Sequence, residues 1–145
     1  MKKVLFGFAL IIASLTFGQK VKLKDDIALV DGKEYIKVVE DKAVKHNFKL
    51  MTLEGKNIGY VKYTYYQDSK AVEKTNPEGY VSYFEVVSSD LNTSYFETFS
   101  SIKEVVKILY NSDILDKDSN INSTELEALS KKIGFEFSRR RENSY

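Results

Sequence analysis

The chain has 145 residues, with 22 lysine and arginine side chains against 21 aspartate and glutamate side chains, and it contains no cysteine. This length predicts one domain with a single core, and the near-neutral charge argues against a nucleic-acid-binding protein, which normally shows a clear basic excess. The absence of cysteine excludes a disulfide framework, thiolate chemistry and a lipid anchor attached to a cysteine after a cleaved signal.

The first eighteen residues have the pattern of a removable export signal. Two lysines precede an apolar run over residues 4–13. Thr16 and Gly18 then occupy the positions three and one residues before a cut that would leave Gln19 at the new N-terminus, and a cut after Ser14 is the alternative. The run is shorter than the roughly 20 residues that span a bilayer. We therefore predict an exported protein, in the periplasm or outside the cell, with no integral membrane segment after signal removal.

The mature chain is predicted to form one domain. Taking eighteen residues from 145 leaves 127, and because two lysines and no acids depart with the signal, the net charge changes from +1 to −1. We predict a single exported domain over residues 19–138 and a flexible tail over 139–145. Two basic clusters, at residues 20–24 and 139–141, are interpreted as a solvated strand face and part of this tail, so no nucleic-acid site is predicted.

We predict two hairpins in the N-terminal half of this domain. The dipeptide Asp31-Gly32 separates the apolar runs 27–30 and 35–39, and glycine accepts the positive φ that a tight hairpin turn demands. A longer loop separates a second pair of runs, over residues 48–53 and 58–66. Both segments therefore predict antiparallel strand pairs.

The next segments predict a bulge, a loop and two further strands. Gly59 lies just inside its predicted strand, which is typical of a bulge. The polar stretch 67–79 contains Pro77, the only proline, and is predicted to be the most mobile loop. Alternating side chains over 80–87 and 94–99 predict two more strands.

The C-terminal part changes to a helical period. A capping box at Ser101 and one apolar face predict a helix to about residue 111, and a second helix is predicted from Asn122 to Gly134. Alternating phenylalanines over 135–137 predict a short last strand. Strands followed by helices indicate an α+β fold, with an antiparallel β-sheet built from hairpins and about two C-terminal helices packed on one face.

The segment between the two helices resembles a calcium-binding loop. Asp116, Asp118 and Asn120 provide oxygens at loop positions one, three and five, and Glu127 stands at position twelve. Position six requires a glycine for its sharp turn, and Ile121 stands there; a frame shifted by two residues lacks the first acidic ligand. We interpret the segment as a polar inter-helix loop and predict no metal site.

Three further residues are candidate catalytic groups. His46 is the only histidine, which excludes a zinc site built on paired histidines, and we predict that it is exposed near the start of a strand. Glu85 and Glu97 lie among aromatic residues on neighbouring predicted strands and form the best carboxylate pair for glycoside hydrolysis. The alternative is that these glutamates are cross-strand partners of lysines on a solvent-exposed face. No catalytic residue and no cofactor is assigned.

Aromatic residues are concentrated on three consecutive predicted strands. They are Tyr60, Tyr63, Tyr65, Tyr66, Tyr80, Tyr83, Phe84, Tyr95, Phe96 and Phe99. Adjacent strand residues point in opposite directions, so these side chains cannot all face the core, and some aromatic surface is expected on the outer face. Such a surface is a candidate site for a sugar, peptide, lipid or partner chain. The alternative is an ordinary sheet whose tyrosine hydroxyls reach water.

The signal ending Thr16-Phe17-Gly18, followed by turns such as Asp31-Gly32 and Glu54-Gly55, resembles small exported proteins of Bacteroidota-type bacteria. This resemblance implies export but no shared activity. We therefore expect a non-enzymatic exported binding or envelope-associated module that contacts a small molecule, glycan or protein partner. The alternatives are a hydrolase acting on envelope polymers and a purely structural protein.

Overall fold

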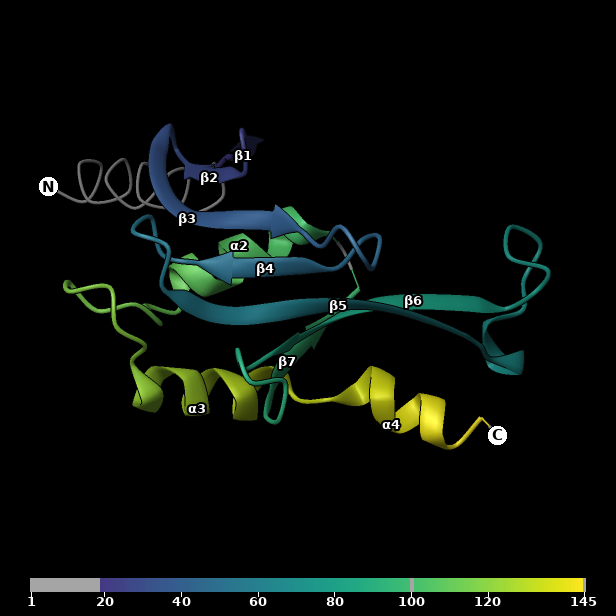
Figure 1. The fold of residues 1–145 in the computed structure, drawn as a ribbon. Coiled ribbons are helices and arrows are strands. Elements are labelled where there is room, and N and C mark those ends of the chain that lie inside the picture. Colours follow the sequence, from purple (N-terminus) through teal and green to yellow (C-terminus); the bar gives the residue numbers. More distant parts are fainter. Residues whose placement is uncertain (1–18, 100, 145) are drawn as a thin grey trace, which may run out of the picture.

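The computed structural model describes residues 19–99 and 101–144, so the segment assigned to the export signal lies outside the described residues. Within them, one antiparallel sheet contains seven strands in the order in which they occur in the chain (Figure 1). The strands are β1 (Val21–Lys24), β2 (Ile27–Val30), β3 (Lys33–Glu40), β4 (Phe48–Met51), β5 (Asn57–Gln67), β6 (Tyr80–Val87) and β7 (Ser94–Thr98). The helices are α2 (Ile102–Asn111), α3 (Ser123–Ile133) and α4 (Glu136–Glu142), with a short 3-10 helix η1 (Ser69–Ala71). The predicted α+β class and the antiparallel sheet are confirmed.

Tight turns set the pairing of the first three strands. Asp31 and Gly32 have φ values of 51° and 82°, so both central residues of the β2–β3 turn are left-handed, as the sequence predicted. Asp25 and Asp26, at 51° and 65°, form an equivalent turn between β1 and β2. The sequence analysis missed this second turn because it contains no glycine, although aspartate tolerates the left-handed region better than most residues.

The hairpin of β4 and β5 contains the predicted bulge. Leu50 pairs with Gly59 whereas Met51 pairs with Asn57, so the register shifts by one residue at this point. A side chain at Gly59 would place its Cβ 2.7 Å from the carbonyl oxygen of Val87 on β6. The position therefore requires glycine because the neighbouring backbone approaches it closely.

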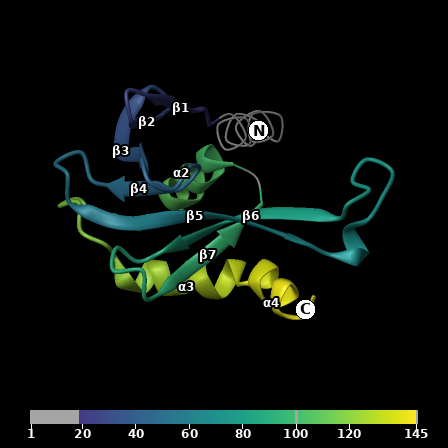
Figure 2. The ribbon, with the colours of Figure 1, turned by 45° about the vertical axis from the view of Figure 1, so that its right-hand side comes forward.

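One face of the sheet, here named the inner face, forms the hydrophobic core. Its buried side chains follow the cross-strand pairing from Val38 to Leu50 and from Val61 through Val86 to Phe96. The helices complete this core with Val105, Val106 and Leu109 from α2 and with Leu126 and Leu129 from α3. Helix α2 lies within the curve formed by β1, β2 and β3, and α3 runs along the edge strand β7 (Figure 2).

The ends of the two predicted helices are those that the sequence indicated. The Ser101 hydroxyl accepts a hydrogen bond of 3.3 Å from the backbone N–H of Glu104 at the start of α2. The Asn122 side chain accepts an equivalent bond of 3.3 Å from Glu125 at the start of α3, and Gly134 follows its last residue. Local capping signals were therefore sufficient to locate both helices.

The predicted strand over residues 135–137 is wrong. Helix α4 occupies this segment and reaches into the residues assigned to a tail, and it lies on the side of the sheet away from α2 (Figure 2). Its Phe137 ring stacks on Tyr83 with a centroid separation of 5.4 Å and an interplanar angle of 12°. Two alternating phenylalanines were too short a pattern to distinguish a strand from one turn of helix.

Candidate functional site

The aromatic residues of β5, β6 and β7 divide between the two faces of the sheet. Tyr66 and Tyr83, on the outer face opposite α2, are buried. Tyr65 and Tyr80 lie on the inner face beyond the end of α2, where 66% and 48% of their surfaces are exposed, and Phe99 is 71% exposed. The predicted exposed aromatic surface is therefore present. Tyr65 and Tyr80 lie on the inner face, however, whereas the prediction placed exposed rings on the outer face.

Phe99 is one of the residues that line a groove with a volume of about 400 Å³, and we name it the aromatic groove. Its lining comes from the inner face of β4, β5 and β6, the end of β7 and the start of α2. The lining residues are His46, Phe48, Tyr63, Ser82, Phe84, Phe99, Ser101 and Ile102. The groove exists because α2 begins at Ile102 and covers the sheet only on one side of that point.

The rings of the aromatic groove are held by edge and tilted contacts. Tyr63 lies 5.3 Å from Phe84 at an angle of 54°, and His46 lies 5.6 Å from Tyr63 at 68°. The backbone N–H of His46 donates to Glu40 at 3.0 Å, and the backbone N–H of Tyr63 donates to the Asn47 side chain at 2.8 Å. The first bond ties the loop before β4 to the end of β3, and the second ties it to β5. His46 is exposed and stands two residues before β4, as predicted.

The chemistry of this lining suits an uncharged ligand. Its polar groups are the hydroxyls of Tyr63, Ser82 and Ser101 and the imidazole of His46, and its lining contains no lysine, arginine, aspartate or glutamate. Aromatic rings provide apolar faces for packing, and the hydroxyl groups provide hydrogen-bond partners of fixed position. Such a lining recognises shape and hydroxyl pattern rather than charge.

Glu85 and Glu97, the candidate carboxylate pair, both accept hydrogen bonds within the fold. Glu85 and Glu97 pair directly across β6 and β7 and therefore point to the same face. Glu97 is 3% exposed, and its carboxylate accepts hydrogen bonds from the backbone N–H groups of Phe137 at 2.9 Å and Ser138 at 3.2 Å, and from the Ser138 hydroxyl. Glu85 accepts a bond of 2.5 Å from the Ser94 hydroxyl. The carboxylate of Glu97 thus serves as the hydrogen-bond acceptor for the start of α4.

The segment that resembles a calcium-binding loop is held by hydrogen bonds between its own side chains and backbone. One oxygen of Asp116 accepts hydrogen bonds from the backbone N–H groups of Asp118 at 2.8 Å and Asn120 at 2.9 Å, which holds the pKa of Asp116 below its ordinary value. Glu127 lies on α3 and pairs with Lys131 at 2.7 Å. In the described ranges, no group of three or more histidine, cysteine, aspartate or glutamate side chains is placed to hold a metal ion.

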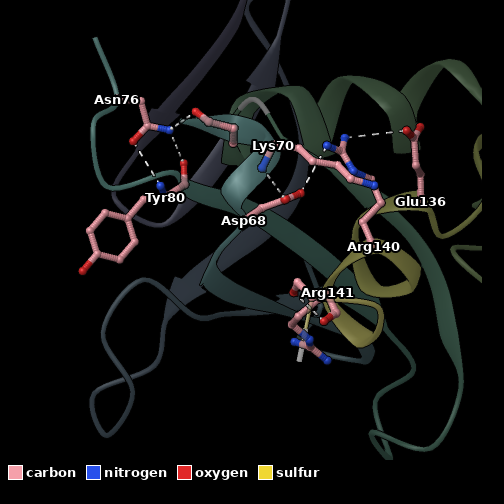
Figure 3. Close-up of polar contacts among 9 residues, drawn as sticks. Asp68, Lys70, Asn76, Tyr80, Glu136, Arg140 and Arg141 are labelled. Carbon is pink, nitrogen blue, oxygen red and sulfur yellow. Dashed lines mark hydrogen bonds and ion pairs between the residues drawn. The ribbon is translucent and has the colours of Figure 1, made fainter. Parts of the chain in front are cut away.

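The arginine cluster near the C-terminus docks α4 onto the long β5–β6 hairpin (Figure 3). Arg140 lies 3.4 Å from Asp68 and 3.8 Å from Glu136, and Asp68 also accepts a bond of 2.9 Å from the backbone N–H of Lys70. The Arg141 guanidinium lies 5.9 Å from the centre of the Tyr83 ring. Burial raises the pKa of the Tyr83 hydroxyl to about 12.

These contacts were missed because the sequence analysis interpreted the arginines as part of a tail. The available signal was the spacing of Glu136 and Arg140, four residues apart, which is typical of one helix face. The arginines consequently belong to the packing of α4.

Two general findings complete the description. Within the part of the chain that the structure describes, no helix has the length and apolar character needed to cross a membrane. No protein-family model, curated protein or solved structure matches this chain. Function is therefore inferred from the surface of the molecule itself.

Proposed function

We propose that this chain is a non-enzymatic exported binding module whose aromatic groove binds a neutral glycan of the cell envelope or its surroundings. The observation that carries this proposal is the combination of four aromatic rings with hydroxyl groups and an imidazole, and with no charged side chain, in one groove of about 400 Å³. A sugar ring offers an apolar face to an aromatic ring and hydroxyls to the polar groups around it, so this lining fits a glycan closely.

Other ligand classes fit the aromatic groove less well. Most of the groove lies over β4, β5 and β6, each of which is already paired on both sides, so a peptide has no free strand edge to extend there. An acyl chain is best held where water is excluded, whereas Phe99 is 71% exposed at this groove. A charged headgroup would find no opposite charge in the lining.

Binding of neutral oligosaccharides tests this proposal. Cello-, chito- and malto-oligosaccharides are titrated into residues 19–145 by isothermal calorimetry, with a set of unstructured peptides as the competing class. Phe99→Ala removes an exposed ring, so it should weaken glycan binding about tenfold while the chain stays folded. Val72→Ala is the matched control, because Val72 is 53% exposed directly after η1 and does not line this groove.

Two results would contradict the proposal. One is glycan binding that Phe99→Ala and Val72→Ala weaken equally. The other is binding of peptides in the absence of any glycan binding.

The export part of the proposal is supported by the signal pattern of residues 1–18 alone. Expression of the full chain in a Gram-negative host, followed by fractionation and mass spectrometry, tests it. We expect a periplasmic or secreted product that begins at Gln19, and an uncleaved cytoplasmic product would contradict it.

A further inference from the structure

The outer face of the sheet carries a set of lysines that the aromatic groove does not use. Lys24, Lys37, Lys49 and Lys62 come from β1, β3, β4 and β5, and we name them the lysine face. Lys24 pairs with Ile27, and Ile27 pairs in turn with Lys37, so these two lysines share one cross-strand row. Lys24 and Lys49 are exposed, and Lys37 and Lys62 are half-buried.

Strand register places the last three of these lysines in a line. Lys37 pairs with Met51, and Lys49 lies two residues before Met51 on the same strand. Lys49 pairs with Tyr60, and Lys62 lies two residues after Tyr60. Such diagonal neighbours on one face of a sheet are about 7–8 Å apart. Positive charge is therefore repeated at a regular spacing across three adjacent strands.

A second groove, with a volume of about 750 Å³, contains Lys49 and Lys62 of this line, and we name it the outer groove. Its lining residues are Val39, Asp41, Asn47, Lys49, Met51, Asn57, Gly59, Tyr60, Lys62, Ser89 and Leu91. Apolar and aromatic side chains thus lie beside two lysines, two amides and the carboxylate of Asp41, which already accepts the Tyr60 hydroxyl. A ligand that fits it must offer both negative charge and an apolar surface.

The charge of the lysine face is not used within the described part of the chain. No lysine of this face makes an ion pair within 4.0 Å there. The nearest acids are otherwise engaged: Asp41 accepts bonds from the Tyr60 hydroxyl at 2.7 Å and from Ala43 at 2.8 Å, and Glu85, the register partner of Lys62, accepts the bond from Ser94. The ammonium groups of Lys37, Lys49 and Lys62 are therefore free of ion pairs among the described residues, with Asp41 in the same groove and Glu85 opposite Lys62 held by other hydrogen bonds.

We infer that the outer groove binds an acidic polysaccharide, a chain of sugars that carries carboxylates at regular intervals. The carboxylates meet the ammonium groups of Lys49 and Lys62, and the sugar rings lie on Met51 and Tyr60 beside them. Lys37, the register partner of Met51, lies next to the groove and extends the line of charge. A single phosphate would need only one or two of these lysines, whereas a polymer of repeated charge uses the whole line. The site is distinct from the aromatic groove because it lies on the opposite face of the sheet.

Polygalacturonate is the probe for this inference, with dextran as the uncharged polymer and vesicles of anionic phospholipid as the competing class. Lys49→Gln combined with Lys62→Gln should raise the Kd for polygalacturonate about tenfold. Lys103→Gln combined with Lys117→Gln removes the same charge from exposed positions on and after α2, and should change the Kd by about twofold or less. Added salt should weaken binding of the unmodified protein because charged contacts are screened.

The single variant Lys49→Gln, at an exposed position, keeps the test valid if the double variant fails to fold, since it must weaken binding as well. Equal losses in the two double variants would overturn the inference, as would an absence of polygalacturonate binding or stronger binding to the vesicles. Phe99→Ala should leave polygalacturonate binding unchanged, so a failure of the aromatic groove proposal is distinguishable from a failure of this one.

Discussion

The carboxylate of Glu97 on β7 accepts a hydrogen bond of 2.9 Å from the backbone N–H of Phe137, forty residues later in the chain. This contact supplies the N-terminal cap of α4, because Phe135, at the N-cap position, makes no side-chain capping bond. A seven-residue helix is too short to be stable by itself. The sheet therefore provides the cap that keeps α4 folded.

Substitution of Glu97 should accordingly destabilise the protein. Glu97→Ala leaves the N–H groups of Phe137 and Ser138 without their acceptor, and we expect the free energy of unfolding to fall by about 2–3 kcal/mol in a urea titration. Glu97→Gln keeps one acceptor oxygen and should cost about half as much. Glu85→Ala is the control, because this half-exposed partner on β6 bonds only the Ser94 hydroxyl. Equal losses for Glu97→Ala and Glu85→Ala would contradict the capping role.

Removal of the Tyr66 hydroxyl should stabilise the protein. Tyr66 is 3% exposed, its hydroxyl has no hydrogen-bond partner among the residues that the structure describes, and burial raises its pKa. A buried hydroxyl without a partner carries a desolvation cost, so Tyr66→Phe should increase the free energy of unfolding by about 1 kcal/mol. Tyr65→Phe, at a position that is 66% exposed, should have no measurable effect. A loss of stability in Tyr66→Phe would mean that the hydroxyl is satisfied in solution.

The elements that could be predicted from the sequence are those with local signals. The turn at Asp31-Gly32 and the caps at Ser101 and Asn122 depend on neighbouring residues, and each is where the pattern indicated. Helix α4 has no such signal, because its cap is Glu97 and its ion-pair partner Asp68 is 72 residues from Arg140. Long-range contacts of this kind override local pattern.

The candidate sites also depend partly on local patterns, which the sequence predicts, and partly on long-range contacts, which it does not. Alternation along the strands predicted that some aromatic rings remain exposed, but which rings these are depends on the part of the inner face that α2 covers. The lysine face could not be found from the sequence either. Lys37, Lys49 and Lys62 are far apart in the chain and become neighbours only through the register of three strands.

The bond between Tyr60 and Asp41 should be visible in an acid titration. The Tyr60 hydroxyl donates to Asp41 at 2.7 Å and is the main cause that lowers the pKa of Asp41 below its ordinary value of 3.8. Because the folded pKa is lower than the unfolded one, this contact stabilises the fold above the unfolded pKa. The contribution is lost as the pH falls through the folded pKa.

Tyr60→Phe should therefore raise the pKa of Asp41 toward 3.8 and move acid unfolding to a higher pH. Carboxyl-detected NMR titration measures the first effect, and circular dichroism against pH measures the second. Asp90 is an internal control, since its lowered pKa is caused mainly by Ser88 and should not change. An unchanged pKa at Asp41 in the variant would show that the bond is not formed in solution.

Gly79 closes the loop between β5 and β6, and we expect it to tolerate no side chain. Its φ is 66°, and its carbonyl accepts a hydrogen bond of 2.8 Å from the backbone N–H of Asp68. A Cβ at this position would clash with the backbone oxygen of Asp68, which cannot move without disturbing the residue that pairs with Arg140. The substitution therefore acts on both the loop and the docking of α4.

Gly79→Ala should lower the free energy of unfolding by about 3 kcal/mol, through left-handed strain and the steric clash together. Gly32→Ala separates the two effects, because Gly32 has a φ of 82° but open space around its Cβ position, and it should cost only about 1 kcal/mol. Urea unfolding of both variants measures the difference. Equal losses would mean that the loop relaxes around the added methyl group, and α4 would then remain docked in Gly79→Ala.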